Sequence, residues 1–321
     1  MPSIYLRGSA FDSSEGNETY LLVNGESRGM SQNRGLNTVI LQPDGTAKAQ
    51  TSHDVYSDQN LWNAWADWVN ANAQTGDIVT VASFDAVNNA PWGGTADGLL
   101  KSIGAQTAFN VIQGTDWRMV RSPYVLLFVK GLPRALEVSQ PHTGPNAHLS
   151  VQFAAIYQHN DYGGAGQALS AGQYNINDLL IGNDQLSSLR VPDGLQVTLY
   201  EHMDLQGNAR TYTADAPSVG DFNDQASSIL VEQVVTIYEH SDYQGQSKTL
   251  KIGHYNMADL GIGNDQLSSL KVPPGLKVTL FQHADFSGET RGYNANVAFT
   301  QDFNDQTSSI VVEQGPAPIL L

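Results

Sequence analysis

The chain has 321 residues and a mass of 34.7 kDa, which is enough for two or three domains with substantial cores. Its 32 acidic residues outnumber 16 Lys and Arg, and the formal net charge of -16 disfavours nucleic acid and anionic membrane surfaces and favours cations as partners. Cysteine is absent, which excludes a disulfide scaffold, a thiolate metal site and a cysteine nucleophile.

The first residues of the chain bear on export and membrane insertion. Residues 1–7 contain neither a basic region nor the apolar stretch of a classical signal peptide, and no apolar run approaches the ~18 residues of a membrane span. We therefore expect a soluble chain without a membrane span. Any export signal is removed or absent.

The first 137 residues predict strands and helices in alternation. Continuous apolar runs at 36–41, 78–83 and 124–129 are typical of buried strands. Between the first two runs, a helical spacing begins after Ser57 or Asp58 as N-cap and stops before Gly76, with apolar positions at Leu61, Trp62, Trp65, Trp68 and Val69. The tryptophans of this helix fit core positions better than a ligand platform.

A second helix is predicted near 95–103, and Gly104 ends it. Strands and helices mixed in this way indicate an α+β domain over residues 1–137. A linker rich in Pro, His and Gly follows, and we place it at residues 138–152.

The order and spacing of short motifs in this domain resemble the interleukin-like EMT inducer (ILEI) domain. The motifs are Arg34-Gly-Leu-Asn37, Pro43-Asp-Gly45, His53-Asp-Val-Tyr56, Gly76-Asp-Ile-Val79, Asp85-Ala86, Leu100-Lys-Ser-Ile-Gly104 and Trp117-Arg118. Animal cytokine-like members carry disulfides, which this chain cannot form, so signalling is not carried over.

The resemblance extends to the stem domain of the O-mannose N-acetylglucosaminyltransferase, which binds β-linked N-acetylglucosamine. By position, the sugar contacts of that domain imply Asp85 and Arg118 here, with Trp92 and Trp117 as candidate aromatic faces for a sugar ring. The alternative is an Asp85–Arg118 surface ion pair without a ligand.

The rest of the chain is a tandem repeat. The segment 174–191 recurs 81 residues later at 255–272 with 14 of 18 positions identical, and 221–233 recurs at 302–314 with 11 of 13 identical. This self-similarity predicts two domains, at 153–234 and 235–316.

Each of these domains is itself double. The segment Asn-Asp-Gln-x-Ser-Ser occurs four times, starting at Asn183, Asn223, Asn264 and Asn304. An aromatic hairpin precedes each copy, at Tyr157, Tyr200, Tyr238 and Phe281, and places a Gly just after the turn. Four such units of short strands predict paired Greek keys that form two β-sandwiches.

The hairpins and the Asn-Asp-x-x-Ser-Ser segments resemble βγ-crystallin domains over about half of the chain. In the microbial members, two such segments face each other and clamp two calcium ions. Calcium takes ~6 to 8 oxygen ligands at irregular geometry, and these segments offer carboxylate, hydroxyl and carbonyl oxygens.

Carried over by position, the resemblance implies about four calcium ions per chain. The first domain would supply side chains or main-chain carbonyls of Asp184, Gln185, Ser187, Asp224, Gln225 and Ser227. The second domain would supply Asp265, Gln266, Ser268, Asp305, Gln306 and Ser308. One carboxylate per segment predicts moderate affinity, about micromolar to millimolar.

Two alternatives apply to these segments. One is that they are only turns, because Asn, Asp and Ser are common turn residues. The other is a transition-metal site formed by the hairpin histidines His159, His202, His240 and His283. We disfavour the second because the repeat places each histidine on a separate hairpin.

These features predict a non-enzymatic, calcium-binding lectin-like protein, in which the N-terminal domain recognises a glycan and the crystallin-like domains form a calcium-stabilised stalk. The alternative is a structural or stress protein similar to microbial spherulins. No nucleophile elbow, zinc-protease motif or phosphate loop is present. We expect an extracellular or cell-surface setting, with cytoplasmic retention as the alternative, and the sequence leaves the oligomeric state open.

Overall fold

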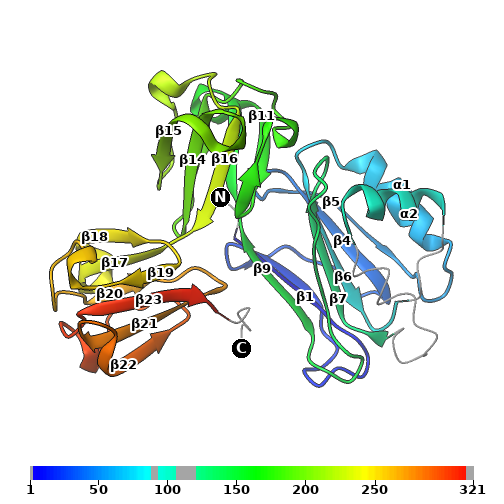
Figure 1. Ribbon diagram of the computed structural model, residues 1–321. Coiled ribbons are helices and arrows are strands. Elements are labelled where there is room, and N and C mark those ends of the chain that lie inside the picture. The colour runs from blue at the N-terminus through cyan, green and yellow to red at the C-terminus, as the bar shows by residue number, and fades with distance from the viewer. Residues whose placement is uncertain (1–2, 88–92, 106–120, 316–321) are drawn as a thin grey trace.

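The computed structural model describes residues 3–87, 93–105 and 121–315. These residues are mostly β, with two α-helices and six sheets. We refer to residues 3–152 as the N-terminal unit, to 153–234 as the first repeat unit and to 235–315 as the second repeat unit. Figure 1 shows the first repeat unit (green to yellow) beside the N-terminal unit and the second repeat unit running from yellow to red.

The centre of the N-terminal unit is a five-stranded antiparallel sheet of order β5-β4-β6-β7-β8. Its strands are β4 (Gly35–Leu41), β5 (Ala47–His53), β6 (Ile78–Phe84), β7 (Tyr124–Val129) and β8 (Leu136–Ser139). The continuous apolar runs of β4, β6 and β7 are explained by burial of both faces of this sheet.

Helices α1 (Leu61–Asn72) and α2 (Gly94–Ser102) cover one face of the sheet, as Figure 1 shows. Trp62 and Trp65 are fully buried there, which confirms a core role for these two tryptophans, whereas Trp68 is half-buried. The helix starts later than the sequence predicts: its N-cap is Asn60, which makes no side-chain capping bond. Asp58 Oδ1 instead accepts from Asn60 N in the preceding turn.

A four-stranded sheet of order β3-β2-β1-β9 covers the other face. Its strands are β1 (Ser3–Gly8), β2 (Tyr20–Val23), β3 (Glu26–Ser27) and β9 (Ala147–Gln152). The segment expected as a linker at 138–152 therefore contributes β9, which pairs with β1 over its whole length. Apolar residues on alternate positions of β9 and the burial of Ala147 explain this pairing.

Each repeat unit contains two antiparallel sheets with exchanged strands. The first repeat unit has the sheets β11-β10-β13 and β12-β16-β14-β15. Its strands are β10 (Ala154–His159), β11 (Gly163–Leu169), β12 (Gly172–Tyr174), β13 (Ser188–Arg190), β14 (Leu195–His202), β15 (Gln206–Tyr212) and β16 (Ser228–Gln233). Strand β12 crosses from the first half to pair with β16 of the second half, which is the Greek-key exchange.

The second repeat unit repeats this topology as β18-β17-β20 and β19-β23-β21-β22. Its strands are β17 (Val235–His240), β18 (Gln244–Leu250), β19 (Gly253–Tyr255), β20 (Ser269–Lys271), β21 (Leu276–His283), β22 (Ser287–Tyr293) and β23 (Ser309–Gln314). The predicted Greek-key sandwiches are present in both units.

The cores are not divided one per unit. One cluster of buried apolar side chains runs from Ile4 and Leu6 through Phe153 to Val231, and so joins the N-terminal and first repeat units. The second repeat unit has a cluster of its own that includes Phe303. None of the helices in the described part of the chain is long and apolar enough to cross a membrane.

Candidate metal sites

The two motif loops of each repeat unit lie against each other. In the first repeat unit, Asp184 N donates to Ala226 O at 3.4 Å, and Asp224 N donates to Leu186 O at 3.0 Å. In the second, Asp265 N donates to Thr307 O and Asp305 N to Leu267 O, both at 3.2 Å. The Greek-key pairing thus brings loops about 40 residues apart in the sequence into direct contact.

The motif aspartates share one backbone conformation. Asp184, Asp224, Asp265 and Asp305 all have left-handed φ values, between 52° and 55°. Asp and Asn adopt this region more readily than other non-glycine residues, so the turn itself selects these residue types. Backbone geometry alone therefore does not distinguish a turn from a metal site, and the side chains must.

The carboxylates and hydroxyls pair across the loops. Ser227 Oγ donates to Asp184 Oδ1 at 3.1 Å, and Ser187 Oγ lies 3.4 Å from Asp224 Oδ1. The second repeat unit repeats this arrangement with distances of 3.2 Å for Ser308–Asp265 and 3.3 Å for Ser268–Asp305. Each aspartate predicted from sequence therefore lies beside the serine of the opposite motif.

Two further oxygens join these groups that sequence reasoning did not identify. Ser187 Oγ donates to the carbonyl of Gln158 at 2.7 Å, and Ser268 Oγ donates to the carbonyl of Glu239 at 2.8 Å. Both carbonyls follow the hairpin aromatic, at positions 158 and 239. Their approach depends on strand register, which the hairpin motif alone does not specify.

Several oxygens around the loops lack partners. The buried Oδ1 atoms of Asn183, Asn223 and Asn304 accept no hydrogen bond within the described residues, while their amide nitrogens donate to the neighbouring aspartates. Buried polar oxygens are almost always satisfied by protein, water or an ion. These atoms are therefore available to a ligand at three of the four loops.

The four motif glutamines use their side chains locally. Gln185 and Gln266 donate from Nε2 to the carbonyl of the preceding aspartate, whereas Gln225 and Gln306 donate to Asp221 O and Asp302 O. No hydrogen bond to the main-chain carbonyls of these glutamines occurs in the described part of the chain. Those carbonyls remain open to a cation.

The second serine of each motif has another role. Ser188 is fully buried, donates from Oγ to His159 O at 2.6 Å and accepts from Tyr162 N at 3.0 Å. Ser228, Ser269 and Ser309 make the same two contacts with their own hairpins. This serine ties the motif to the hairpin that precedes it.

The hairpin histidines do not converge. His159, His202, His240 and His283 are all exposed, one on each hairpin. The described residues contain no group of three or more His, Asp or Glu placed to hold a metal ion. The candidate sites instead consist of single carboxylates with hydroxyl, amide and carbonyl oxygens, a set that suits a hard cation.

The predicted glycan contacts of the N-terminal unit are only partly covered. Arg118, Trp92 and Trp117 lie outside the described residues. Asp85 follows β6 and has a left-handed φ of 64°, and its main chain is held by Asn17 Oδ1, which accepts from Asp85 N at 3.2 Å, and by Phe11 N, which donates to Asp85 O at 2.9 Å. No hydrogen bond of its carboxylate is found among the described residues.

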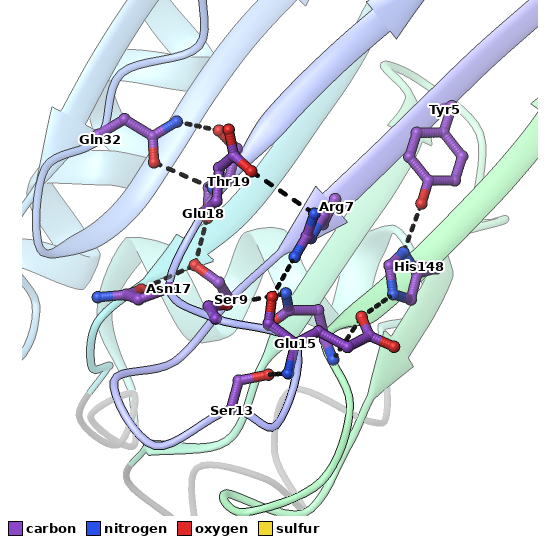
Figure 2. Close-up of polar contacts among 12 residues, drawn as sticks. Tyr5, Arg7, Ser9, Ser13, Glu15, Asn17, Glu18, Thr19, Gln32 and His148 are labelled. Carbon is purple, nitrogen blue, oxygen red and sulfur yellow. Dashed lines mark hydrogen bonds and ion pairs between the residues drawn. The ribbon is translucent and has the colours of Figure 1, made fainter. Parts of the chain in front are cut away.

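A polar cluster fixes the loop that holds Asp85. Figure 2 shows His148 between Tyr5 and Glu15, with Tyr5 Oη 2.5 Å from Nδ1 and Glu15 Oε2 2.7 Å from Nε2. Arg7 donates to Glu15 O at 2.9 Å. The cluster anchors residues 9–17 on β1 and β9, and so sets the position of the Asp85 main chain.

Two Greek-key units that each contain the same paired Asp and Ser oxygens define a protein of the βγ-crystallin type. Residues 196–272 match the family described as Beta/Gamma crystallin. The chain is 33% identical over 167 residues to a development-specific protein S homolog from Myxococcus xanthus, an alignment that covers 48% of this chain and 95% of that protein. The chain belongs to the beta/gamma-crystallin family.

One further protein and one solved domain structure are similar to parts of the chain. Development-specific protein S of Myxococcus xanthus is 32% identical over 166 residues, covering 48% of this chain and 95% of that protein. A solved βγ-crystallin domain from Flavobacterium johnsoniae is 34% identical, with 27% of this chain and 100% of that domain covered and a TM-score of 0.26.

Proposed function

We propose that this chain is a non-enzymatic structural protein of the stress type whose repeat units are stabilised by calcium, with two ions in each unit. The observation that carries the proposal is the reciprocal pairing of Asp184 with Ser227 and of Asp224 with Ser187, repeated at similar distances in the second repeat unit. Membership of the beta/gamma-crystallin family supports the same function.

The residues fit calcium on their own chemistry. Every candidate donor is an oxygen, and the orphaned Oδ1 atoms of Asn183, Asn223 and Asn304 lie next to the aspartates. Each ion would be held by one carboxylate, one hydroxyl and main-chain carbonyls, with water completing its shell. Such sites leave magnesium, which requires near-ideal octahedral geometry, at a disadvantage.

Thermal unfolding in calcium and in chelator tests this function. A ligand that binds only the folded state stabilises it by about 2.7 kcal/mol per site at one hundred times Kd. We therefore expect a higher melting temperature with calcium than with chelator, and a smaller rise with magnesium at the same concentration. Identical melting curves in calcium and chelator would overturn the proposal.

Glycan binding by the N-terminal unit is a second candidate function. It is favoured by Asp85, whose carboxylate makes no hydrogen bond among the described residues although its main chain is held in place by Asn17 and Phe11. Assignment of residues 1–137 to an ILEI-like α+β domain is part of this candidate, and the packing of α1 and α2 on the five-stranded sheet supports it.

A titration with N-acetylglucosamine tests this candidate. Saturable NMR shifts of residues around Asp85 that Asp85→Asn abolishes are the expected result. If no resonance near Asp85 shifts, only the structural function remains. Calcium sites of moderate affinity suit an extracellular or cell-surface setting, which we propose for the chain.

A further inference from the structure

A polar cavity of about 510 Å³ lies at the junction of the N-terminal unit and the first repeat unit. The N-terminal unit contributes the turn between β4 and β5, with Gln42, Pro43 and Asp44. The first repeat unit contributes two hairpin glycines and the aromatic pair with its cation, which are Gly164, Gly166, Tyr157, Tyr162 and Arg190. None of these residues belongs to the candidate metal sites.

The wall formed by the first repeat unit is held by contacts among its own side chains. The rings of Tyr157 and Tyr162 meet edge to face, with 5.8 Å between centroids, and the Arg190 guanidinium lies 3.7 Å from the Tyr162 centroid. Arg190 also pairs with Asp215 at 3.3 Å. Its positive charge is therefore balanced within its own unit and does not require an anionic ligand.

The opposite wall presents a carboxylate. Asp44 Oδ1 accepts from Thr46 N at 2.8 Å, and Asp44 has no ion pair among the described residues. Burial raises the pKa of the Tyr157 hydroxyl, and the charges of Arg190 and Asp44 act on it in opposite directions. Both charged groups line the cavity together with Tyr157, one from each unit.

The second junction of the chain shows how such a site can be closed. Its equivalent aromatic pair is Tyr238 and Tyr243 with the cation Lys271, which lies 5.1 Å from the Tyr243 centroid. There, Lys271 forms an ion pair of 2.5 Å with Asp193 in another Pro-Asp-Gly turn. The first junction has the same parts, but its aspartate and cation are not joined.

The hairpin at the first junction has smaller residues than the other three hairpins. Positions 163, 165 and 166 read Gly, Ala and Gly, whereas the other three hairpins carry Gln or Ser, then Asn, Gln or Glu, then Ala, Ser or Thr. A Cβ at Gly76 of the N-terminal unit would lie 2.7 Å from Gly166 O. Glycine at position 76 therefore permits this close approach of the N-terminal unit to the hairpin that carries Gly166.

We propose that this cavity binds an uncharged pyranose unit of a glycan. The carboxylate of Asp44, the amide of Gln42 and the guanidinium of Arg190 are planar groups that can bind adjacent hydroxyls in pairs, while tyrosine rings accept the apolar edge of a sugar ring. The volume lies within the range of small-molecule sites. This site differs from the candidate at Asp85.

NMR titration of the full chain, labelled with ¹⁵N at its glycines, tests the proposal. The probes are the methyl pyranosides of glucose, galactose and mannose. Free glycine, a zwitterion that could bind Asp44 and Arg190 together, is the comparison ligand. We expect saturable shifts of Gly164 and Gly166 with at least one glycoside, at a Kd of about 1 to 10 mM, in calcium and in chelator alike. No saturable shift with any of the three, or tighter binding of glycine, would overturn it.

Matched variants locate the site. Asp44→Asn keeps the acceptor for Thr46 N and removes the charge, so the turn survives while affinity falls about tenfold. Asp193→Asn, in the equivalent turn of the second junction, and Asp85→Asn should leave affinity unchanged. Binding that Asp44→Asn does not weaken would contradict the proposal, as would equal loss in Asp193→Asn.

Discussion

At the scale of single residues, two adjacent serines in each motif have separable roles. Ser187 Oγ lies between the Gln158 carbonyl and the Asp224 carboxylate, whereas Ser188 Oγ is fully buried against the hairpin backbone. The first is placed to serve a cation, and the second holds the fold. The two serines are adjacent in an extended segment, where successive side chains point to opposite faces. Each serine therefore contacts a different set of groups.

This difference leads to a paired prediction. Ser187→Ala should reduce the calcium-dependent rise in melting temperature and, through loss of the hydrogen bond to the Gln158 carbonyl, cost about 0.5 to 1.5 kcal/mol in chelator. Ser188→Ala leaves the amide of Tyr162 without its acceptor and should cost about 1 to 3 kcal/mol equally in calcium and chelator. Equilibrium unfolding of both variants in both buffers is the measurement, and equal behaviour of the two serines would refute the assignment.

The motif aspartates can be tested without disturbing their backbone. Asp184→Asn keeps a residue that tolerates the left-handed φ of 52°, so the stability in chelator should change by less than about 0.5 kcal/mol. Loss of the carboxylate should weaken one calcium site of the first repeat unit, which calorimetric titration would detect. Asp161→Asn is the control, since Asp161 has a φ of 55° outside the motifs.

At the scale of elements, local patterns predict the buried central strands of the N-terminal unit but not all of its elements. The apolar runs at 36–41, 78–83 and 124–129 coincide with β4, β6 and β7, because strands buried on both faces carry a continuous apolar signal. The predicted N-cap of α1 lies two or three residues before the observed one, Asn60. Ser57 and Asp58 instead form hydrogen bonds within the turn that precedes the helix. Strand β9 was missed because the Pro- and Gly-rich residues before it dominate the local pattern.

The candidate metal sites show the same limit. Sequence repetition placed the four aspartates and serines, whereas the carbonyls of Gln158 and Glu239 come from another strand. Their contribution depends on the register in which Tyr157 pairs with Ser188 and Tyr238 with Ser269. Long-range pairing of this kind leaves no local trace in residue type.

Strand β5 carries a histidine that should make stability depend on pH. His53 is half-buried, its buried Nδ1 has no hydrogen-bond partner among the described residues, and desolvation lowers its pKa. The unfolded chain therefore binds a proton more readily, so stability is full above the unfolded pKa of about 6.5 and is lost as pH falls through the folded pKa.

Replacement of this histidine is the direct test. His53→Gln should flatten the fall in unfolding free energy between about pH 7.5 and 5.5, whereas His159→Gln on an exposed hairpin should not. The neighbouring Asp54 does not interfere, because the hydrogen bond from Arg34 lowers the pKa of its carboxyl and places its effect below about pH 4. An unchanged pH profile in His53→Gln would refute this role.

At the scale of the whole molecule, the three units differ in how they are joined. The N-terminal and first repeat units share one apolar cluster. In addition, the Arg134 guanidinium of the N-terminal unit lies 4.4 Å from the ring centroid of Tyr174 and forms an ion pair with Asp178, both in the first repeat unit. The first and second repeat units meet through polar contacts such as Lys271–Asp193 and Gln233 Nε2 to Pro274 O. Shared apolar burial couples unfolding more strongly than exposed ion pairs.

We therefore expect two cooperative transitions instead of three. All five tryptophans precede residue 118, so tryptophan fluorescence reports only on the N-terminal unit. Phe222 and Phe303 occupy equivalent buried positions in the two repeat units, and truncation of either to alanine should cost about 3 to 5 kcal/mol. Phe222→Ala should lower the fluorescence midpoint through the shared core, and Phe303→Ala should leave it in place. A fluorescence midpoint that ignores Phe222→Ala would mean that the first two units unfold independently.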